Sequence, residues 1–194
     1  MELDNNYWSN RYSNDTATWD TGKITPPLKA YFDQLTNKEI NILIPGCGNS
    51  YEAAYLLQNG FTNITLIDIS ATLCKALEEK FAVHLQKELQ IICADFFEHK
   101  GQYDLIIEQT FFCALDPSFR NKYAEKMQQL LKTKGKLVGL LFNRDFDGGP
   151  PFSGHENEYR QLFQQHFDIA IMEACYNSIA PRSGAELFIK LIKK

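Results

Sequence analysis

The chain has 194 residues, which suits one domain, and its 44% of hydrophobic residues can supply a substantial core. A formal net charge of -4 and a pI near 5.6 argue against a broad basic surface for nucleic acid or anionic lipid. Five scattered cysteines without a C-x-x-C pair, an acidic and polar N-terminus, and the lack of an apolar run of about 20 residues predict a soluble, cytoplasmic protein with reduced thiols.

The chain begins with a segment that we interpret as an arm. Residues 5–25 are polar, contain several aromatic side chains and show little periodicity, so we expect residues 1–25 to lie as a lid over one domain that covers 1–194. Pro26-Pro27 then begins a short helix, because proline is tolerated in a first helical turn.

From residue 40 onward, short apolar runs alternate with amphipathic segments. The apolar runs predict strands at 40–44, 64–67, 89–93, 103–107, 136–142, 169–175 and 186–192. The amphipathic segments predict helices that follow an N-cap at Asn49 (with Glu52 three residues on), follow Ser70, run from Asp116-Pro117 to near Gly135, and cover about 155–165. The alternation predicts an α/β fold: a seven-stranded, mostly parallel sheet with helices on both faces and a C-terminal antiparallel hairpin.

A glycine-containing turn follows the first predicted strand. Gly46-Cys47-Gly48 lets the backbone turn sharply and approach a ligand closely. Tyr51 stands where the third glycine of a dinucleotide-binding turn would fall, so a pyrophosphate site fits poorly. A tight turn without a ligand is the alternative for this segment.

Acidic residues follow the next two strands. Asp68 comes about twenty residues after the turn, where a ribose-binding carboxylate belongs. Asp95-Phe96 joins a carboxylate that could accept the exocyclic amine of adenine to a ring that could cover a face of the base. Either aspartate taken singly also fits a helix cap. Together, the three features at the carboxyl ends of successive strands predict a nucleoside-binding site.

Several further segments show a family pattern when read together. They are Tyr7-Trp8, Tyr12, Thr18-Trp19-Asp20-Thr21-Gly22, Ile44-Pro45-Gly46-Cys47-Gly48, Asp68, Asp95-Phe96-Phe97, 103–115 and 148–152. With them the chain resembles the thiopurine S-methyltransferase superfamily, and especially its halide/thiol methyltransferase branch. This resemblance implies a Rossmann-like class I fold, S-adenosylmethionine as the methyl donor, and a small soft nucleophile (a thiol, thiopurine or halide) that is methylated by in-line displacement.

The resemblance also implies roles for particular residues. The arm would enclose the cofactor, and Gly46 would lie against its amino-acid part. Asp68 would hold the ribose and Asp95-Phe96 the adenine. Gln109, after the fourth strand, would line the methionine end. In chain order, the cofactor-binding residues are then Trp8, Tyr12, Trp19, Gly46, Asp68, Asp95, Phe96 and Gln109. Plant halide/thiol enzymes tend to have tryptophan where Tyr12 stands and tyrosine where Gln109 stands, and both departures bear on acceptor preference.

A dry aromatic pocket suits a sulfonium donor and an anionic acceptor. Phe111 and Phe112 are expected to be divided between such a pocket and the core. Arg182, and after it Arg144, are candidate cations for an anionic acceptor, with a solvated loop arginine as the alternative for each. His155 begins a predicted helix near this region, with surface capping as its alternative. The four histidines show no metal-ligand spacing, so we expect no metal.

Other functions fit less well. A nucleotide-dependent oxidoreductase would have a third glycine in the turn, which this chain lacks, and it would not need the tryptophan-containing arm. A nucleic-acid methyltransferase is disfavoured by the acidic charge and by Glu108-Gln109-Thr110-Phe111, which stands where an Asn/Asp-Pro-Pro-Tyr/Phe signature would fall. A non-catalytic module that binds S-adenosylmethionine or a nucleoside remains an alternative. The expected partner is a small-molecule acceptor, without nucleic acid or membrane, and the expected oligomeric state is a monomer.

Overall fold

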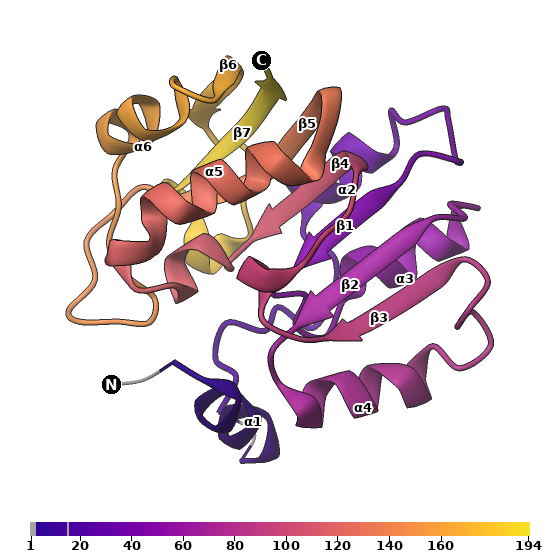
Figure 1. Cartoon of the computed structure of the whole chain (residues 1–194). Helices are drawn as coiled ribbons and strands as arrows, with labels where there is room; N and C mark the ends of the chain where they lie inside the picture. Colours follow the sequence, from indigo (N-terminus) through magenta and orange to yellow (C-terminus); the bar gives the residue numbers. More distant parts are fainter. Residues whose placement is uncertain (1–2, 15) are drawn as a thin grey trace.

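The computed structural model describes residues 3–14 and 16–194 and places a seven-stranded sheet at their centre (Figure 1). Its strands are β1 (Ile42–Pro45), β2 (Ile64–Asp68), β3 (Leu89–Cys93), β4 (Tyr103–Gln109), β5 (Leu131–Phe142), β6 (Phe167–Ala174) and β7 (Glu186–Lys193). They are ordered β3-β2-β1-β4-β5-β7-β6. The strands β1 to β5 run parallel, whereas β7 is antiparallel to both β5 and β6. The predicted mostly parallel sheet with a C-terminal antiparallel hairpin is therefore confirmed.

Helices cover both faces of the sheet, as the alternation of side chains along each strand requires. The helices are α1 (Asn5–Ser13), α2 (Pro26–Phe32), α3 (Tyr51–Gln58), α4 (Ala71–Lys80), α5 (Arg120–Leu130) and α6 (Glu156–Phe163). Leu43 of β1 packs in one core layer with α5 and α6, while its neighbours Ile42 and Ile44 pack in the other with α2, α3 and α4. None of the helices in the described residues is long and apolar enough to cross a membrane.

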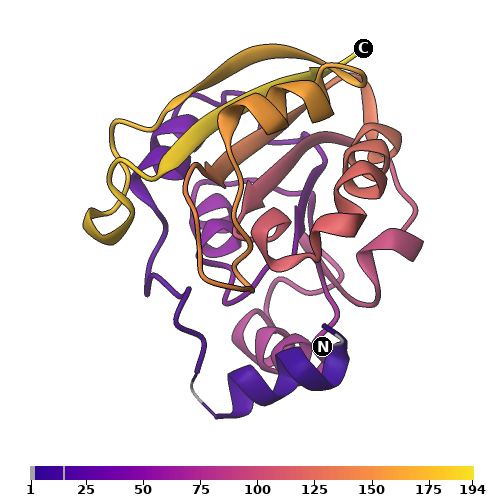
Figure 2. The same cartoon turned by 90° about the vertical axis from the view of Figure 1, so that its left-hand side faces the viewer.

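The N-terminal arm differs from the sequence-based expectation, because part of it forms the helix α1. The Asp4 carboxylate caps this helix by accepting the Tyr7 N–H at 2.9 Å. The helix then docks on the start of α4 through polar groups: Asn5 Oδ1 accepts the Ala71 N–H at 2.8 Å, and the Ser9 and Ser70 hydroxyls lie 3.0 Å apart. Figure 2 shows α1 alongside α4. Because these contacts are polar, α1 lacks the apolar periodicity by which a helix is recognised in sequence.

Several element boundaries also differ from the prediction, among them the start of β5, which begins at Leu131 instead of residue 136. Ser50, and not Asn49, is the N-cap residue of α3, and its φ of 53° lies in the left-handed region. A 3-10 turn follows Asp116, and α5 ends at Leu130 instead of near Gly135. The helix stops early because Leu131 is already extended and pairs with Tyr103 at the start of β5.

The strand order determines where a ligand can bind. From β1 the chain proceeds to β2 and β3 on one side and then returns to β4 and β5 on the other. In open parallel sheets the crevice at such a reversal, at the carboxyl ends of the strands, is the usual ligand site. In Figure 1 α1 lies beyond the end of the sheet toward which the arrowheads of β2 and β4 point.

Candidate active site

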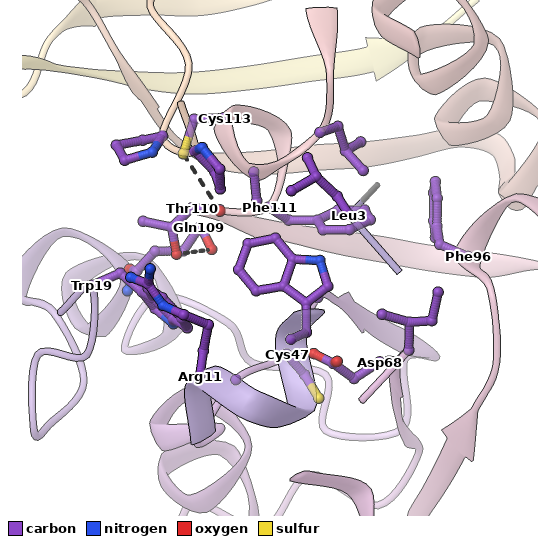
Figure 3. A pocket seen from close by; sticks show the side chains of 18 of the residues that line it. Leu3, Arg11, Trp19, Cys47, Asp68, Phe96, Gln109, Thr110, Phe111 and Cys113 are labelled. Atoms are coloured by element: carbon purple, nitrogen blue, oxygen red, sulfur yellow. Dashed lines mark hydrogen bonds between the residues drawn. The ribbon is translucent and has the colours of Figure 1, made fainter. Parts of the chain in front are cut away.

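A cavity of about 870 Å³ opens at the carboxyl ends of β1, β2 and β4. Its volume lies in the range of ~300–1,000 Å³ that is typical of sites for small organic ligands. Every residue that the sequence suggested for the cofactor or the acceptor borders it: Trp8, Tyr12, Trp19, Gly46, Asp68, Asp95, Phe96, Gln109, Arg144 and Arg182. The close-up in Figure 3 shows Asp68 and Phe96 on one side of this cavity and Arg11 and Trp19 on the other.

The turn after β1 is shaped by its two glycines. Gly46 has a φ of 54° and Gly48 a φ of 49°, a region in which side chains with a Cβ are strained. At Gly46 there is also no room for a side chain, because a Cβ there would lie 2.2 Å from the Phe111 ring. Phe111 is half-buried at the cavity whereas Phe112 is buried in the core, so the expected division between them is confirmed.

Asp68 is a buried carboxylate at the end of β2. It is 9% exposed, borders the cavity, and accepts the Ser70 N–H at 2.9 Å. Burial raises the pKa of Asp68 to about 6, although backbone N–H groups that include Ser70 and Gly48 oppose the shift by favouring the ionised form. One side of this carboxylate is thus held by the backbone while the residue faces the cavity.

In the Asp95-Phe96 pair, the carboxylate is engaged as a cap and the ring is mostly buried. The exposed Asp95 carboxylate accepts the Phe97 N–H at 2.8 Å and caps a short 3-10 turn, so the helix-cap alternative is realised while the residue still borders the cavity. Phe96 is only 5% exposed and packs edge-on against Phe111 at a centroid distance of 5.1 Å. Its neighbour Phe97, which the sequence did not single out for the site, also borders the cavity and stacks on Phe119 at 5.4 Å.

The aromatic side chains of the arm form a cluster at the cavity. Trp19 lies at its centre, with its ring 5.5 Å from that of Trp8 and 5.8 Å from that of Tyr12, both edge-on. The Arg11 guanidinium lies over the Trp19 ring at 5.1 Å. Such contacts between cations and rings fix both side chains in place.

Hydrogen bonds tie this arm to the sheet and to the glycine turn. The Thr25 hydroxyl donates to Gln109 Oε1 at 2.7 Å, which joins the arm to the end of β4. The Asp20 carboxylate accepts from the Tyr51 hydroxyl at 3.2 Å and from the Asn49 amide. Hydrogen bonds to the end of β4, to the glycine turn and to α3 therefore hold the arm beside the cavity.

Arg182 is buried, so the alternative of a solvated loop arginine does not apply to it. It is 8% exposed, lies 3.3 Å from the buried Glu186 carboxylate, and donates to the Trp19 carbonyl at 2.8 Å. Its guanidinium also lies over the Phe142 ring at 5.4 Å. Arg144 is exposed at the cavity, with its guanidinium 4.8 Å from the centre of the Phe146 ring. Arg182 thus joins the loop before β7 to the arm.

Replacing Arg182 by methionine is expected to lower the free energy of unfolding by about 3 kcal/mol, because it leaves the Glu186 carboxylate buried without a counter-charge. Methionine retains the packing against Phe142. Urea denaturation measures the change, and the double variant with Glu186→Met should recover most of it. A loss for Arg182→Met that is no larger than for an exposed arginine such as Arg160→Met would contradict the expectation.

Glu108 fixes the loop after β4 and was not singled out in the sequence. It is fully buried, and one carboxylate oxygen accepts the N–H groups of Phe111 and Phe112 at 2.9 and 3.0 Å. The other oxygen accepts the Tyr123 hydroxyl. An acid inside the otherwise apolar run of β4 is the signal that could have revealed it. Burial outweighs these hydrogen bonds and raises the pKa of Glu108 to about 7.

Buried carboxyl groups predict that the protein loses stability as pH rises. Glu52 and Glu108 have pKa values raised to about 7 and Asp68 to about 6, so each holds its proton more tightly when folded than when unfolded. The free energy of unfolding should therefore fall as pH rises from the unfolded values near ~4. The fall should end about one pH unit above the highest of these folded pKa values.

Thermal denaturation between pH 5 and 8 tests this expectation. The midpoint should fall by roughly 5 °C or more over this range. Glu108→Gln should flatten the profile, whereas Glu125→Gln, an exposed control on α5, should not. A midpoint that rises between pH 5 and 7 would be the contrary result.

Residues that the sequence did not assign to the site also border the cavity, among them the three residues Arg11, Ser50 and Glu52. Each has a buried polar atom without a hydrogen-bond partner in the described part of the chain.

His155 is exposed, with its Nε2 3.0 Å from the Asp145 carboxylate. Within residues 3–14 and 16–194, no group of three or more acidic, cysteine or histidine side chains could hold a metal.

Strand order β3-β2-β1-β4-β5-β7-β6, a glycine turn after β1 and an acid at the end of β2 are together the arrangement of class I S-adenosylmethionine-dependent methyltransferases. Solved structures agree on the fold. A 1,6-didemethyltoxoflavin-N1-methyltransferase from Burkholderia thailandensis, with bound S-adenosylhomocysteine, aligns with a TM-score of 0.75 over 98% of this chain and 87% of that one at 16% identity. The magnesium protoporphyrin IX methyltransferase from Synechocystis, with bound S-adenosylmethionine, aligns with a TM-score of 0.72 over 98% and 95% of the two chains at 14% identity.

The sequence profile of the thiopurine S-methyltransferase (TPMT) family matches residues 3–187, and the chain belongs to this family. It is 30% identical to "Probable thiol methyltransferase 2" of Arabidopsis thaliana, over 92% of this chain and 81% of that protein. It is 29% identical to "Thiocyanate methyltransferase 1" of Brassica oleracea, with the same coverage. It is 25% identical to "Thiopurine S-methyltransferase" of Acinetobacter baylyi, over 88% of each chain. The protein is thus an S-adenosylmethionine-dependent methyltransferase, as the resemblance implied.

Proposed function

We propose that this methyltransferase acts on a small, soft, anionic nucleophile: a thiolate, a thiopurine or a halide. The observation that carries the proposal is the part of the cavity beyond β4. There, two arginine side chains lie against phenylalanine rings, Arg182 over Phe142 and Arg144 over Phe146. Arg182 is paired with Glu186, so the positive charge that can reach an acceptor is that of the exposed Arg144, and it favours an acceptor that is negatively charged and polarisable. The names of the relatives, a thiol, a thiocyanate and a thiopurine methyltransferase, support the same class.

We assign one reactant to each half of the cavity. Asp68 and Phe96 lie toward β2 and β3, and we assign the nucleoside to this half. The arm supplies Trp8, Tyr12 and Trp19 between the halves, and Gln109 at the end of β4 lines the boundary. The acceptor then occupies the half nearest β5 and β7, beside Arg182.

Methyl transfer to a soft anion depends on the alignment of the two reactants and on the exclusion of water more than on a general base. S-adenosylmethionine supplies a methyl group on a positively charged sulfur. Transfer of that methyl group to the lone pair of an anionic acceptor would break the carbon–sulfur bond and cancel the opposite charges. The rings of the arm exclude water and can stabilise the cation by about 0.5–2 kcal/mol each. The positive charge of Arg144 holds an anionic acceptor in line, and a thiol with a pKa of about 8.5 already supplies thiolate near neutral pH.

A panel of acceptors tests the proposal. Purified protein and S-adenosylmethionine are combined with bisulfide, a small thiol, a thiopurine, thiocyanate and iodide, with an amine and a phenol as hard acceptors. Turnover should be confined to the soft acceptors. The rate with a thiol should rise with pH up to the pKa of that thiol, while the rate with iodide, corrected for protein stability, should stay flat. Faster turnover of the amine or the phenol would overturn the proposed acceptor class.

A further inference from the structure

The glycine-turn end of the cavity contains a buried carboxylate that the reaction described above does not use. Glu52 lies in the first turn of α3, borders the cavity and is only 6% exposed. Its Oε1 is buried without a hydrogen-bond partner among the described residues. A buried carboxylate oxygen that accepts no hydrogen bond is costly, so native structures rarely keep one unless a ligand or water completes it.

A buried guanidinium nitrogen on the arm is a hydrogen-bond donor without an acceptor. Arg11 Nε is also buried without a hydrogen-bond partner in the described part of the chain, and Arg11 borders the same cavity. Its guanidinium is fixed over the Trp19 ring. Across the described residues, buried side-chain polar atoms without a partner occur in five residues, and three of them, Arg11, Ser50 and Glu52, line this cavity. The site therefore presents an unpaired acceptor and an unpaired donor of opposite charge.

The position of these groups indicates which part of a ligand they meet. In Figure 3 Arg11 and Trp19 lie on the opposite side of the cavity from Asp68 and Phe96, to which we assign the nucleoside. Glu52 follows the turn of Gly46 and Gly48 directly, six residues after Gly46. A ligand with a nucleoside at Asp68 thus extends past the turn toward Glu52 and Arg11, and its far end in S-adenosylmethionine is a zwitterionic amino acid.

We propose that Glu52 and Arg11 form the receptor for this amino-acid end: Glu52 accepts hydrogen bonds from the α-ammonium, and Arg11 Nε donates to the α-carboxylate. Asp20, Lys80 and Arg182 are charged groups that act on the pKa of Glu52. Lys80 Nζ donates to the Asn49 carbonyl, and Arg182 is paired with Glu186, so both of these cations have partners of their own. The ammonium of the ligand is the cation that Glu52 lacks.

Binding measurements with four ligands test the receptor directly. Calorimetric titration uses S-adenosylhomocysteine, an analogue that keeps only its ammonium, an analogue that keeps only its carboxylate, and 5′-methylthioadenosine, which has neither. The proposal rests on the cofactor assignment but not on the acceptor. The titrations contain no acceptor, so an error in the proposed acceptor class would not alter their outcome.

The two variants should respond in opposite patterns. Glu52→Gln should raise the Kd of S-adenosylhomocysteine and of the ammonium-only analogue by about 10–100-fold, because a hydrogen bond to a charged group is lost. It should leave the other two ligands nearly unchanged. Arg11→Met should weaken S-adenosylhomocysteine and the carboxylate-only analogue instead. Glu79→Gln, an exposed control on α4, should change none of the four.

Several results would overturn the proposal. A Glu52→Gln variant that binds S-adenosylhomocysteine as tightly as the wild type would do so, as would one that weakens all four ligands equally. Should a variant fail to fold, the wild-type protein still decides. It must bind 5′-methylthioadenosine more weakly than S-adenosylhomocysteine, and equal affinity for the two would exclude a receptor for the amino-acid end.

Discussion

Replacing Gly46 by alanine is expected to destabilise the protein by about 2–5 kcal/mol and to abolish measurable cofactor binding. Two costs add at this position. The φ of 54° costs a residue with a Cβ about 1–2 kcal/mol, and overpacking against the Phe111 ring, 2.2 Å from that Cβ, costs about 1–3 kcal/mol. Relief of the clash must move either the turn or Phe111, and both border the cavity.

A second glycine provides a matched control. Gly60 has a φ of 81° at the end of α3, and a Cβ there would meet nothing within 4 Å. Gly60→Ala should therefore show the backbone cost alone and retain cofactor binding. Thermal denaturation and titration with S-adenosylhomocysteine compare the two variants. Equal losses at both positions, or full binding by Gly46→Ala, would mean that the close approach of Phe111 does not shape the site.

The sheet could be predicted because its determinants are local. Each strand is a short apolar run bounded by turn residues, and Leu89–Cys93 was predicted with the bounds that the structure gives it. The helix α1 could not be predicted in this way, because Asn5 and Ser9 dock on α4 through hydrogen bonds that leave no apolar stripe. The N-cap at Ser50 was missed for a related reason. Its positive φ belongs to the turn, while the Asn49 side chain bonds to Asp20 of the distant arm.

In the candidate site, too, residues with local determinants could be predicted and residues buried by distant contacts could not. Residues at strand ends, such as Asp68 and Gln109, could be placed because parallel strands bring their carboxyl ends to one edge. The burial of Arg182 and of Glu52 could not be read from sequence. Arg182 is buried beside Glu186 and donates a hydrogen bond to the Trp19 carbonyl of the arm, a contact between residues 163 positions apart. Burial of a charged side chain is a property of the assembled fold, and the proposed role of Glu52 depends on that burial.

Asp68→Asn is expected to raise the Kd of the cofactor by about 10–100-fold, since it removes the charged acceptor that we assign to the ribose hydroxyls. Asparagine is nearly isosteric, and its amide oxygen can still accept the Ser70 N–H, so the end of β2 should keep its shape. Stability should be equal to or above that of the wild type near pH 8, because a buried carboxylate has been neutralised. Asp95→Asn is the control, and its effect should be smaller because the Asp95 carboxylate is exposed and engaged as a cap.

The pH dependence of binding separates the charge of Asp68 from its shape. Ribose hydroxyls donate to the ionised carboxylate, so a bound nucleoside should lower the pKa of Asp68 below its free value of about 6. Affinity should accordingly be complete above pH 6 and should fall as pH drops below it. Titration with 5′-methylthioadenosine keeps the amino-acid end, and hence Glu52, out of the measurement. The wild type should show this fall and Asp68→Asn should not, whereas a profile shared by both proteins would remove Asp68 from the ribose site.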